Sequence, residues 1–128
     1  MPYFDTDESH EYRYPLGSVV RLVCVLDDDD SPSSLPVFSA NVWVNIRKES
    51  TGKWLNFLTQ IFDGNDYSTD NYKKLMTPYA DGSYETIVNF SLLGETSPDS
   101  YFVRYSTDYD FGGDHVDGTE MIYLYKVD

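Results

Sequence analysis

The sequence predicts an all-β fold, a two-sheet antiparallel β-sandwich of about seven strands. Three observations predict this fold class: several runs in which apolar and polar residues alternate with period two, turn-forming residues between these runs, and no ten-residue stretch with a helical apolar stripe. Aromatic residues, which favour strands, make up 16% of the chain. A chain of 128 residues is long enough for one domain with one core.

The predicted domain organisation is an acidic N-terminal arm followed by a single sandwich domain. Residues 1–15 combine four acidic residues with tyrosines and two prolines, which is typical of an extended arm or an edge strand. Residues 16–128 contain the alternating runs, so we expect this part of the chain to form the sandwich.

The clearest strand runs from Gly17 to Leu26, where β-branched and apolar residues are almost continuous. The residues that follow, Asp27 to Asp30 and then SPSSLP, predict an exposed loop, because adjacent carboxylates repel and proline has no backbone N–H. Two alternating runs within residues 40–62 then predict a hairpin, with Gly52 in its turn.

Three more alternating runs, 84–92, 100–109 and 119–127, complete the predicted strands. Before them, residues 63–72 hold the densest group of turn formers in the chain. Asp81-Gly82, between flanking tyrosines, predicts a second hairpin turn. Short strands separated by regular turns are the pattern of a sandwich.

The charge of the chain argues against direct binding to nucleic acid. There are 22 acidic residues against 9 basic ones, a formal net charge of −13. Such a charge repels phosphates within the Debye length, about 8 Å at physiological salt. It suits a protein partner with a basic surface, a bound cation, or a decoy whose carboxylates imitate phosphates in a basic groove. Solubility alone would also account for it.

The sequence indicates no membrane insertion, because it contains no apolar run of about 18 residues and its first residues are acidic, unlike a secretory signal. We therefore favour the cytoplasm or an assembled particle, and a homo-oligomer or larger assembly stays open. Cys24 is the single cysteine, which excludes an internal disulfide and a multi-thiolate zinc site. Its place in the alternation predicts a buried, unreactive thiol.

Two tryptophans give the clearest indication of a binding site. Alternation places both on the polar face of the predicted hairpin, opposite Leu55, Phe57 and Ile61. The candidate binding residues on that face are Trp43, Asn45, Arg47, Trp54, Asn56 and Gln60. A flat aromatic pair among amides can stack on a sugar ring or anchor a protein interface. The structural alternative is that the N-terminal arm or residues 63–80 cover the two indoles.

A candidate calcium site lies in DYDFGGDHVDGTE, residues 108–120. Its four possible metal ligands are the carboxylates of Asp108, Asp110, Asp114 and Asp117. Hard cations take several oxygen ligands, and glycines permit a tight loop around them. The segment departs from the EF-hand pattern, because Gly112 stands at the third ligand position and Thr119 at the closing one. A solvated acidic loop is the alternative, and no other cofactor is expected.

The sequence offers few groups for catalysis, so we expect no enzyme. His10 falls in the predicted arm and His115 in the acidic loop, and there is no Gly-x-Ser-x-Gly motif or phosphate-binding glycine loop. Paired carboxylates could serve glycoside hydrolysis, but that reaction also needs a deep cleft, which so small a sandwich rarely has.

Two segments resemble parts of immunoglobulin-like domains. GSVVRLVCVL resembles the B strand, in which a cysteine ends an alternating run, and DGSYETIVNFSLLGETSPDSYFVRYS resembles the E–F region. The resemblance, which covers about half of the chain, implies an immunoglobulin-like sandwich with Tyr105 at the position of the second cysteine. Trp43 lies farther from Cys24 than in that family, and the resemblance implies a fold and no function.

A weaker resemblance is to β-sandwich modules that bind starch and glycogen. It involves VWVNIRKESTGKW, YFVRYS and the tyrosine-rich C-terminal run. This resemblance implies carbohydrate binding, although the WDNN-type ligand motif of those modules is absent and DFGGDH stands in its approximate place.

The function that follows from these observations is a non-catalytic interaction module that binds another protein through an aromatic face and acidic loops. Such a module would suit an accessory or structural component of a viral or other multi-subunit assembly, or an acidic decoy for a basic groove. The alternative is a carbohydrate-binding module that uses Trp43 and Trp54 as stacking platforms.

Overall fold

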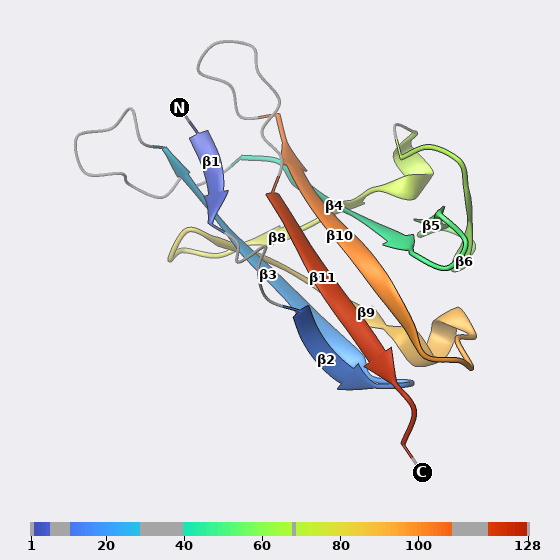
Figure 1. The fold of residues 1–128 in the computed structure, drawn as a ribbon. Coiled ribbons are helices and arrows are strands. Elements are labelled where there is room, and N and C mark those ends of the chain that lie inside the picture. Colours follow the sequence, from blue (N-terminus) through green and yellow to red (C-terminus); the bar gives the residue numbers. More distant parts are fainter. Residues whose placement is uncertain (1, 6–10, 29–39, 68, 109–117, 128) are drawn as a thin grey trace.

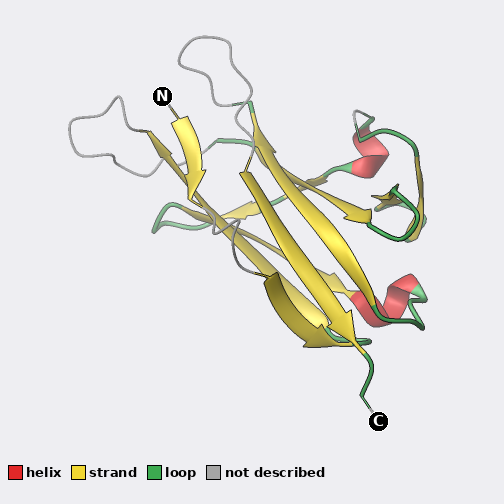
Figure 2. Cartoon of the chain, viewed as in Figure 1, coloured by secondary structure: helices red, strands yellow, loops and turns green. Residues whose placement is uncertain are grey.

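The computed structural model describes residues 2–5, 11–28, 40–67, 69–108 and 118–127. In these residues two β-sheets pack face to face, as Figure 1 shows. Besides strands, turns and loops, the described residues contain two short 3₁₀ helices, η1 (Asp70–Tyr72) and η2 (Phe90–Leu93), which are drawn as helix in Figure 2. The all-β class and the two-sheet sandwich predicted from the alternation are confirmed.

The smaller sheet has four strands, all paired antiparallel. Their order across the sheet is β1 (Pro2–Asp5), β3 (Val19–Asp28), β9 (Ser83–Asn89) and β8 (Thr77–Pro78). The predicted turn at Asp81-Gly82 joins β8 to β9, and Gly82 has a φ of 89°, which favours glycine.

The larger sheet has seven strands. Six follow the order β2 (Glu11–Pro15), β11 (Gly118–Tyr125), β10 (Asp99–Thr107), β4 (Val42–Lys48), β5 (Lys53–Asn56) and β6 (Ile61–Gly64). The seventh, β7 (Lys74–Leu75), pairs with β4. Every pair is antiparallel except β2 with β11, which is parallel.

The N-terminal segment supplies an edge strand to each sheet. β1 pairs with residues 25–28 of β3, and β2 pairs with β11 in the other sheet. Because β1 reaches only to Val25, residues 19–24 of β3 have no described strand beside them on that edge. An edge strand was one of the two forms that the sequence left open for this segment.

The core lies between the sheets and is formed by alternate residues of the long strands. The core residues contributed by β3, β4, β10 and β11 are Val20, Leu22, Cys24, Leu26, Val42, Val44, Ile46, Tyr101, Val103, Tyr105, Ile122 and Leu124. A shift of one residue in any of these strands would expose its whole apolar row, so the alternation fixes the register. Cys24 is buried as predicted, and this burial raises the pKa of its thiol, which keeps it unreactive.

The predicted strand that continued from Trp54 to Ile61 is interrupted, and this prediction was wrong. Residues 57–60 form a turn in which the Asn56 side-chain oxygen accepts hydrogen bonds from the backbone N–H groups of Leu58 (3.0 Å) and Thr59 (3.2 Å). Gln60 adopts a φ of 64° in this exposed turn, so it does not lie on the strand face of Trp54. After this turn the inward and outward positions no longer follow the alternation of β5. Ile61, predicted to share a face with Leu55, is therefore 56% exposed.

The strand predicted over residues 84–92 also ends early, at Asn89. The Asn89 side chain accepts a hydrogen bond from the backbone N–H of Ser91 and so caps η2. An asparagine side chain that accepts hydrogen bonds from nearby backbone N–H groups competes with the hydrogen bonds of a strand. The spacing of apolar residues does not reveal this competition.

Candidate functional site

The outer face of the larger sheet carries aromatic and arginine side chains, although the chain as a whole is acidic. Within the fully described strands β4, β10 and β11, no outward position holds a carboxylate. These positions are Trp43, Asn45, Arg47, Ser100, Phe102, Arg104, Ser106, Thr119, Met121, Tyr123 and Tyr125. The name aromatic–arginine face refers below to Trp43, Arg47, Trp54, Tyr67, Phe102 and Arg104.

Guanidinium groups lie over aromatic rings across this face. The Arg47 guanidinium is 4.7 Å from the ring centre of Phe102 and 5.3 Å from that of Trp54. The Arg104 guanidinium is 4.2 Å from the ring centre of Tyr67. Trp54 in turn contacts Tyr67 and Phe102, with ring centres 4.9 and 6.3 Å apart. These cation–π and aromatic contacts hold the side chains in one arrangement.

Asn45 fixes the segment between β6 and β7 against this face. Its side chain is 1% exposed. The Asn45 Nδ2 donates hydrogen bonds to the backbone carbonyls of Tyr67 (3.4 Å) and Tyr72 (2.7 Å). Its Oδ1 accepts a hydrogen bond from Arg104 Nη1 at 3.0 Å. One buried amide therefore connects β4, β10 and the covering segment.

The structure brings five of the six candidate binding residues together on strands β4 and β5, and leaves Gln60 in the turn. Trp43 and Arg47 are half-buried, whereas the exposed fractions of Asn45, Trp54 and Asn56 are 1%, 6% and 7%. Tyr67 covers Trp54, so part of the 63–80 segment covers one indole, as the structural alternative expected. Trp43 is contacted by the Lys73 ammonium, 4.6 Å from its ring centre.

Sequence reasoning missed Phe102, Arg104 and Tyr67 as members of this face. The alternation within residues 100–109 places Phe102 and Arg104 opposite the core and could have identified them. Tyr67 lies in an irregular segment, where no period predicts which way a side chain points.

Of the four candidate calcium ligands, the structure describes Asp108 alone. Asp110, Asp114 and Asp117 lie outside the described residues, as do both histidines. The Asp108 carboxylate accepts hydrogen bonds from the backbone N–H (3.2 Å) and the side-chain amide (2.8 Å) of Asn41. Across the described ranges, no group of three or more His, Cys, Asp or Glu side chains could hold a metal ion. Calcium binding stays a prediction.

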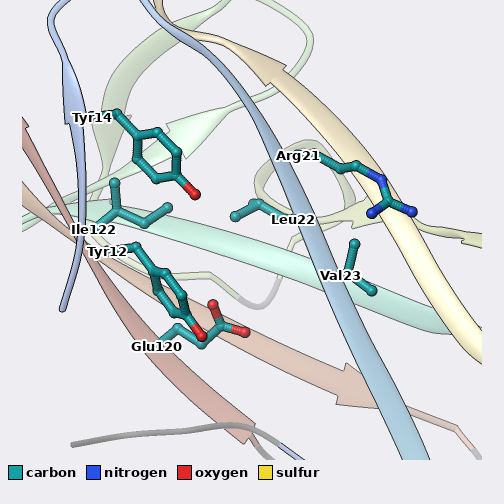
Figure 3. A pocket seen from close by; sticks show the side chains of 7 residues that line it. All are labelled: Tyr12, Tyr14, Arg21, Leu22, Val23, Glu120 and Ile122. Atoms are coloured by element: carbon teal, nitrogen blue, oxygen red, sulfur yellow. The ribbon is translucent and has the colours of Figure 1, made fainter. Parts of the chain in front are cut away.

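A second candidate site is a pocket of about 160 Å³ between strands of the two sheets, shown in Figure 3. It is lined by Tyr12, Tyr14, Arg21, Leu22, Val23, Glu120 and Ile122. Its β3 residues belong to the stretch that extends beyond the pairing with β1, so no described strand closes this side of the pocket.

Glu120 places a carboxylate in this pocket. Glu120 lies two and four residues before the core residues Ile122 and Leu124 in β11, so its side chain leaves the strand on the same, inward side. Burial raises the pKa of Glu120 above its ordinary value, and the neighbouring Tyr105 hydroxyl partly offsets this rise. The Arg21 guanidinium pairs with Glu85 and points away from the pocket in Figure 3. No described residue forms an ion pair with Glu120.

The Tyr105 hydroxyl is a buried polar group beside Glu120. It lies close enough to Glu120 to lower the pKa of that carboxyl, but it makes no hydrogen bond of normal geometry within the part of the chain that the structure describes. Burial raises the pKa of Tyr105 far above its ordinary value, so the hydroxyl keeps its proton. A buried donor without a partner costs about 1–3 kcal/mol of stability. Packing of the core does not require the hydroxyl of Tyr105, because the ring alone fills the same space.

We expect Glu120→Gln to stabilise the protein at neutral pH by on the order of 1 kcal/mol, because it removes a poorly solvated charge. The folded-state pKa of Glu120 lies above its ordinary value of 4.5. The stability that Glu120 contributes is therefore complete below the unfolded-state pKa and is lost as the pH rises through the folded-state pKa. Urea unfolding of both proteins between about pH 4 and about pH 8 measures this difference. If the difference in unfolding free energy between the two proteins does not change with pH, the pKa of Glu120 is not raised by folding.

No model of a known protein family matches the sequence, and no curated protein matches it significantly. No helix in the described residues is long and apolar enough to cross a membrane.

Proposed function

We propose that this protein is a non-catalytic interaction module that binds another protein through the aromatic–arginine face. One observation carries the proposal: in a chain with a net charge of −13, the outward positions of three adjacent central strands hold no carboxylate, and most of them hold arginine, aromatic or methionine side chains beside neutral Asn, Ser and Thr. Aromatic residues, methionine and arginine are enriched at protein interfaces, and Asp, Glu and Lys are depleted there.

The order of the side chains on this face also favours binding. Arg47 and Arg104 each lie over a ring, and Asn45 holds the covering segment in place. Side chains that are fixed before binding lose little rotamer entropy when a partner arrives. The half-buried rings of Trp43 and Phe102 are suited to act as anchors for a partner surface.

The remaining charge suggests how a partner would approach. The net charge of −13 would attract a protein with a basic surface around the contact, and such attraction mainly raises the association rate. The aromatic–arginine face would supply the affinity, and the surrounding carboxylates would steer the partner toward it. This combination would suit a component of a larger assembly or an acidic decoy.

We also infer that the sandwich is of the immunoglobulin type. The strand orders β1-β3-β9-β8 and β11-β10-β4-β5-β6 correspond to the ABED sheet and to the GFC sheet extended by two strands, as in variable-type domains. Tyr105 lies close to Cys24 in the core, at the place expected for the second cysteine. Trp43 departs from this family, because it faces outward and Val44 occupies the core position beside Tyr105.

The proposal predicts that Phe102→Ser weakens binding of the partner at least about thirtyfold, the loss expected for one anchor ring. The partner would be captured with wild-type protein, purified and titrated against both proteins by calorimetry. Trp43→Ser is a second variant of the same face with the same expected direction.

The matched control is Leu92→Ser, which removes an apolar side chain that is 68% exposed and lies in η2, away from this face. Its affinity should equal that of the wild type, and near-ultraviolet circular dichroism should show that all variants are folded. Equal affinity of the Phe102 and Trp43 variants with the wild type would refute the face as the binding surface. Binding to a glycan array that Phe102→Ser abolishes would instead favour carbohydrate binding.

A further inference from the structure

The pocket between β2, β3 and β11 combines one carboxylate with aromatic and aliphatic walls. Glu120 comes from β11, the rings of Tyr12 and Tyr14 come from β2, and Leu22 and Ile122 form the apolar part of the lining. Figure 3 shows both tyrosine rings on the β2 side, with Tyr12 on the same side of the pocket as Glu120. The pocket is separate from the aromatic–arginine face, because its residues have the inward parity in β2 and β11.

The size of the pocket permits a ligand group of several non-hydrogen atoms. Its volume is about 160 Å³, whereas one water needs only about 10–15 Å³ on the same measure. The carboxylate has no cationic partner among the described residues, since Arg21 is paired with Glu85. A cation with N–H donors would satisfy it, and charge-assisted hydrogen bonds of this kind are the strong ones.

The other walls favour the same chemistry. Aromatic rings such as those of Tyr12 and Tyr14 attract cations, and the aliphatic surface of Leu22 and Ile122 suits methylene groups. An anion would be repelled by Glu120 and by the net charge of −13. A neutral apolar ligand would remove water from the carboxylate without replacing its hydrogen bonds.

We propose that this pocket binds a primary alkylammonium group, with the ammonium at Glu120 and the alkyl chain against Leu22 and Ile122. A lysine side chain of another protein and a free small amine share this chemistry. The Tyr105 hydroxyl, which makes no hydrogen bond to a described residue, stands beside Glu120 and is suited to donate to the carboxylate when it is ionised.

Glu120 supplies the negative charge with which the ammonium group would pair. Tyr12 and Tyr14 face the pocket from β2, and Tyr105 from β10 and Cys24 from β3 lie on its core side. Tyr105 and Cys24 stay neutral because burial raises the pKa of both groups. Protonation of Glu120 should therefore release the ammonium, and binding should weaken as the pH falls through the pKa of Glu120.

The test is titration of the full chain with n-butylammonium, followed through the backbone amide shifts of β2 and β11 in ¹H–¹⁵N NMR spectra. The expected result is saturable binding that Glu120→Gln weakens at least about tenfold, the loss expected for a charge-assisted hydrogen bond. Glu11→Gln is the matched control, because it removes the same charge from an exposed side chain that pairs only loosely with Arg13. Its affinity should stay within about twofold of the wild type, as expected for a surface charge.

Three results would overturn the proposal: n-butanol binds as well as n-butylammonium, both glutamine variants lose affinity equally, or n-butylammonium produces no saturable shift.

Tyr14→Leu removes an aromatic wall without touching Glu120 and should also weaken binding, which keeps the test decisive if Glu120→Gln fails to fold. Tighter binding of Nα-acetyl-lysine amide than of n-butylammonium would identify a protein side chain as the source. The reverse order would identify a free amine.

Discussion

Phe90→Ala is expected to lower the free energy of unfolding by about 3–5 kcal/mol, the range typical of buried phenylalanine rings. Phe90 is fully buried, and its ring centre lies 5.0 Å from that of Tyr101. The Tyr101 hydroxyl donates a hydrogen bond to Glu95 (2.8 Å), which also pairs with Lys48 (2.6 Å). A cavity beside Tyr101 would therefore loosen the end of the sandwich where β4 and β10 meet η2. Urea unfolding followed by tryptophan fluorescence measures the change.

Leu92→Ala is the matched control, because Leu92 lies in the same 3₁₀ turn but is 68% exposed. Its effect should be within about 0.5 kcal/mol, as for most surface substitutions. If the two variants were destabilised equally, the intrinsic conformational preference of η2 would matter more than the packing of Phe90 against the core.

The second large effect is expected for Asn45→Ala, at about 2–4 kcal/mol of stability. This change leaves the carbonyl groups of Tyr67 and Tyr72 and the Arg104 guanidinium without their amide partner. Groups that stay buried without a partner each contribute to the loss. Since Tyr67 covers Trp54, the variant should also make that indole more accessible to solvent.

Acrylamide quenching in a Trp43→Phe background would report on Trp54 alone, because the chain has two tryptophans. Asn65→Ala is the control: this residue is exposed in the same segment, and its side chain accepts a hydrogen bond from Lys53. The control should change neither stability nor quenching. Unchanged quenching in the Asn45 variant would show that something other than this amide holds the covering segment.

The two proposed sites lie on opposite faces of the larger sheet. Phe102 and Arg104 in β10 point outward, on the aromatic–arginine face, whereas Glu120 and Ile122 in β11 point inward and line the pocket. Substitutions on one side should therefore leave the ligand of the other side unaffected, because distant sites without shared partners act additively. Loss of both activities from one variant would indicate general unfolding of the sheet.

The sequence by itself determined the fold class and most of the core. Alternation in β3, β4, β10 and β11 assigned the inward side chains correctly, because the period of two is a property of extended backbone in any surroundings. The same rule placed Trp43, Asn45 and Arg47 on the outer face. It failed where a side chain hydrogen-bonds to nearby backbone N–H groups, as Asn56 does in the turn that displaces Gln60.

Only the tertiary structure decided which outward side chains are covered and which inward ones line a pocket. Trp54 is buried because Tyr67 folds back over it, and Asn45 finds its partners in Tyr72 and Arg104, 27 and 59 residues away in the chain. The pocket at Glu120 likewise depends on the parallel pairing of β2 with β11, between the two ends of the chain. Burial and hydrogen-bond partners depend on contacts between distant segments, and local periodicity contains no information about those contacts.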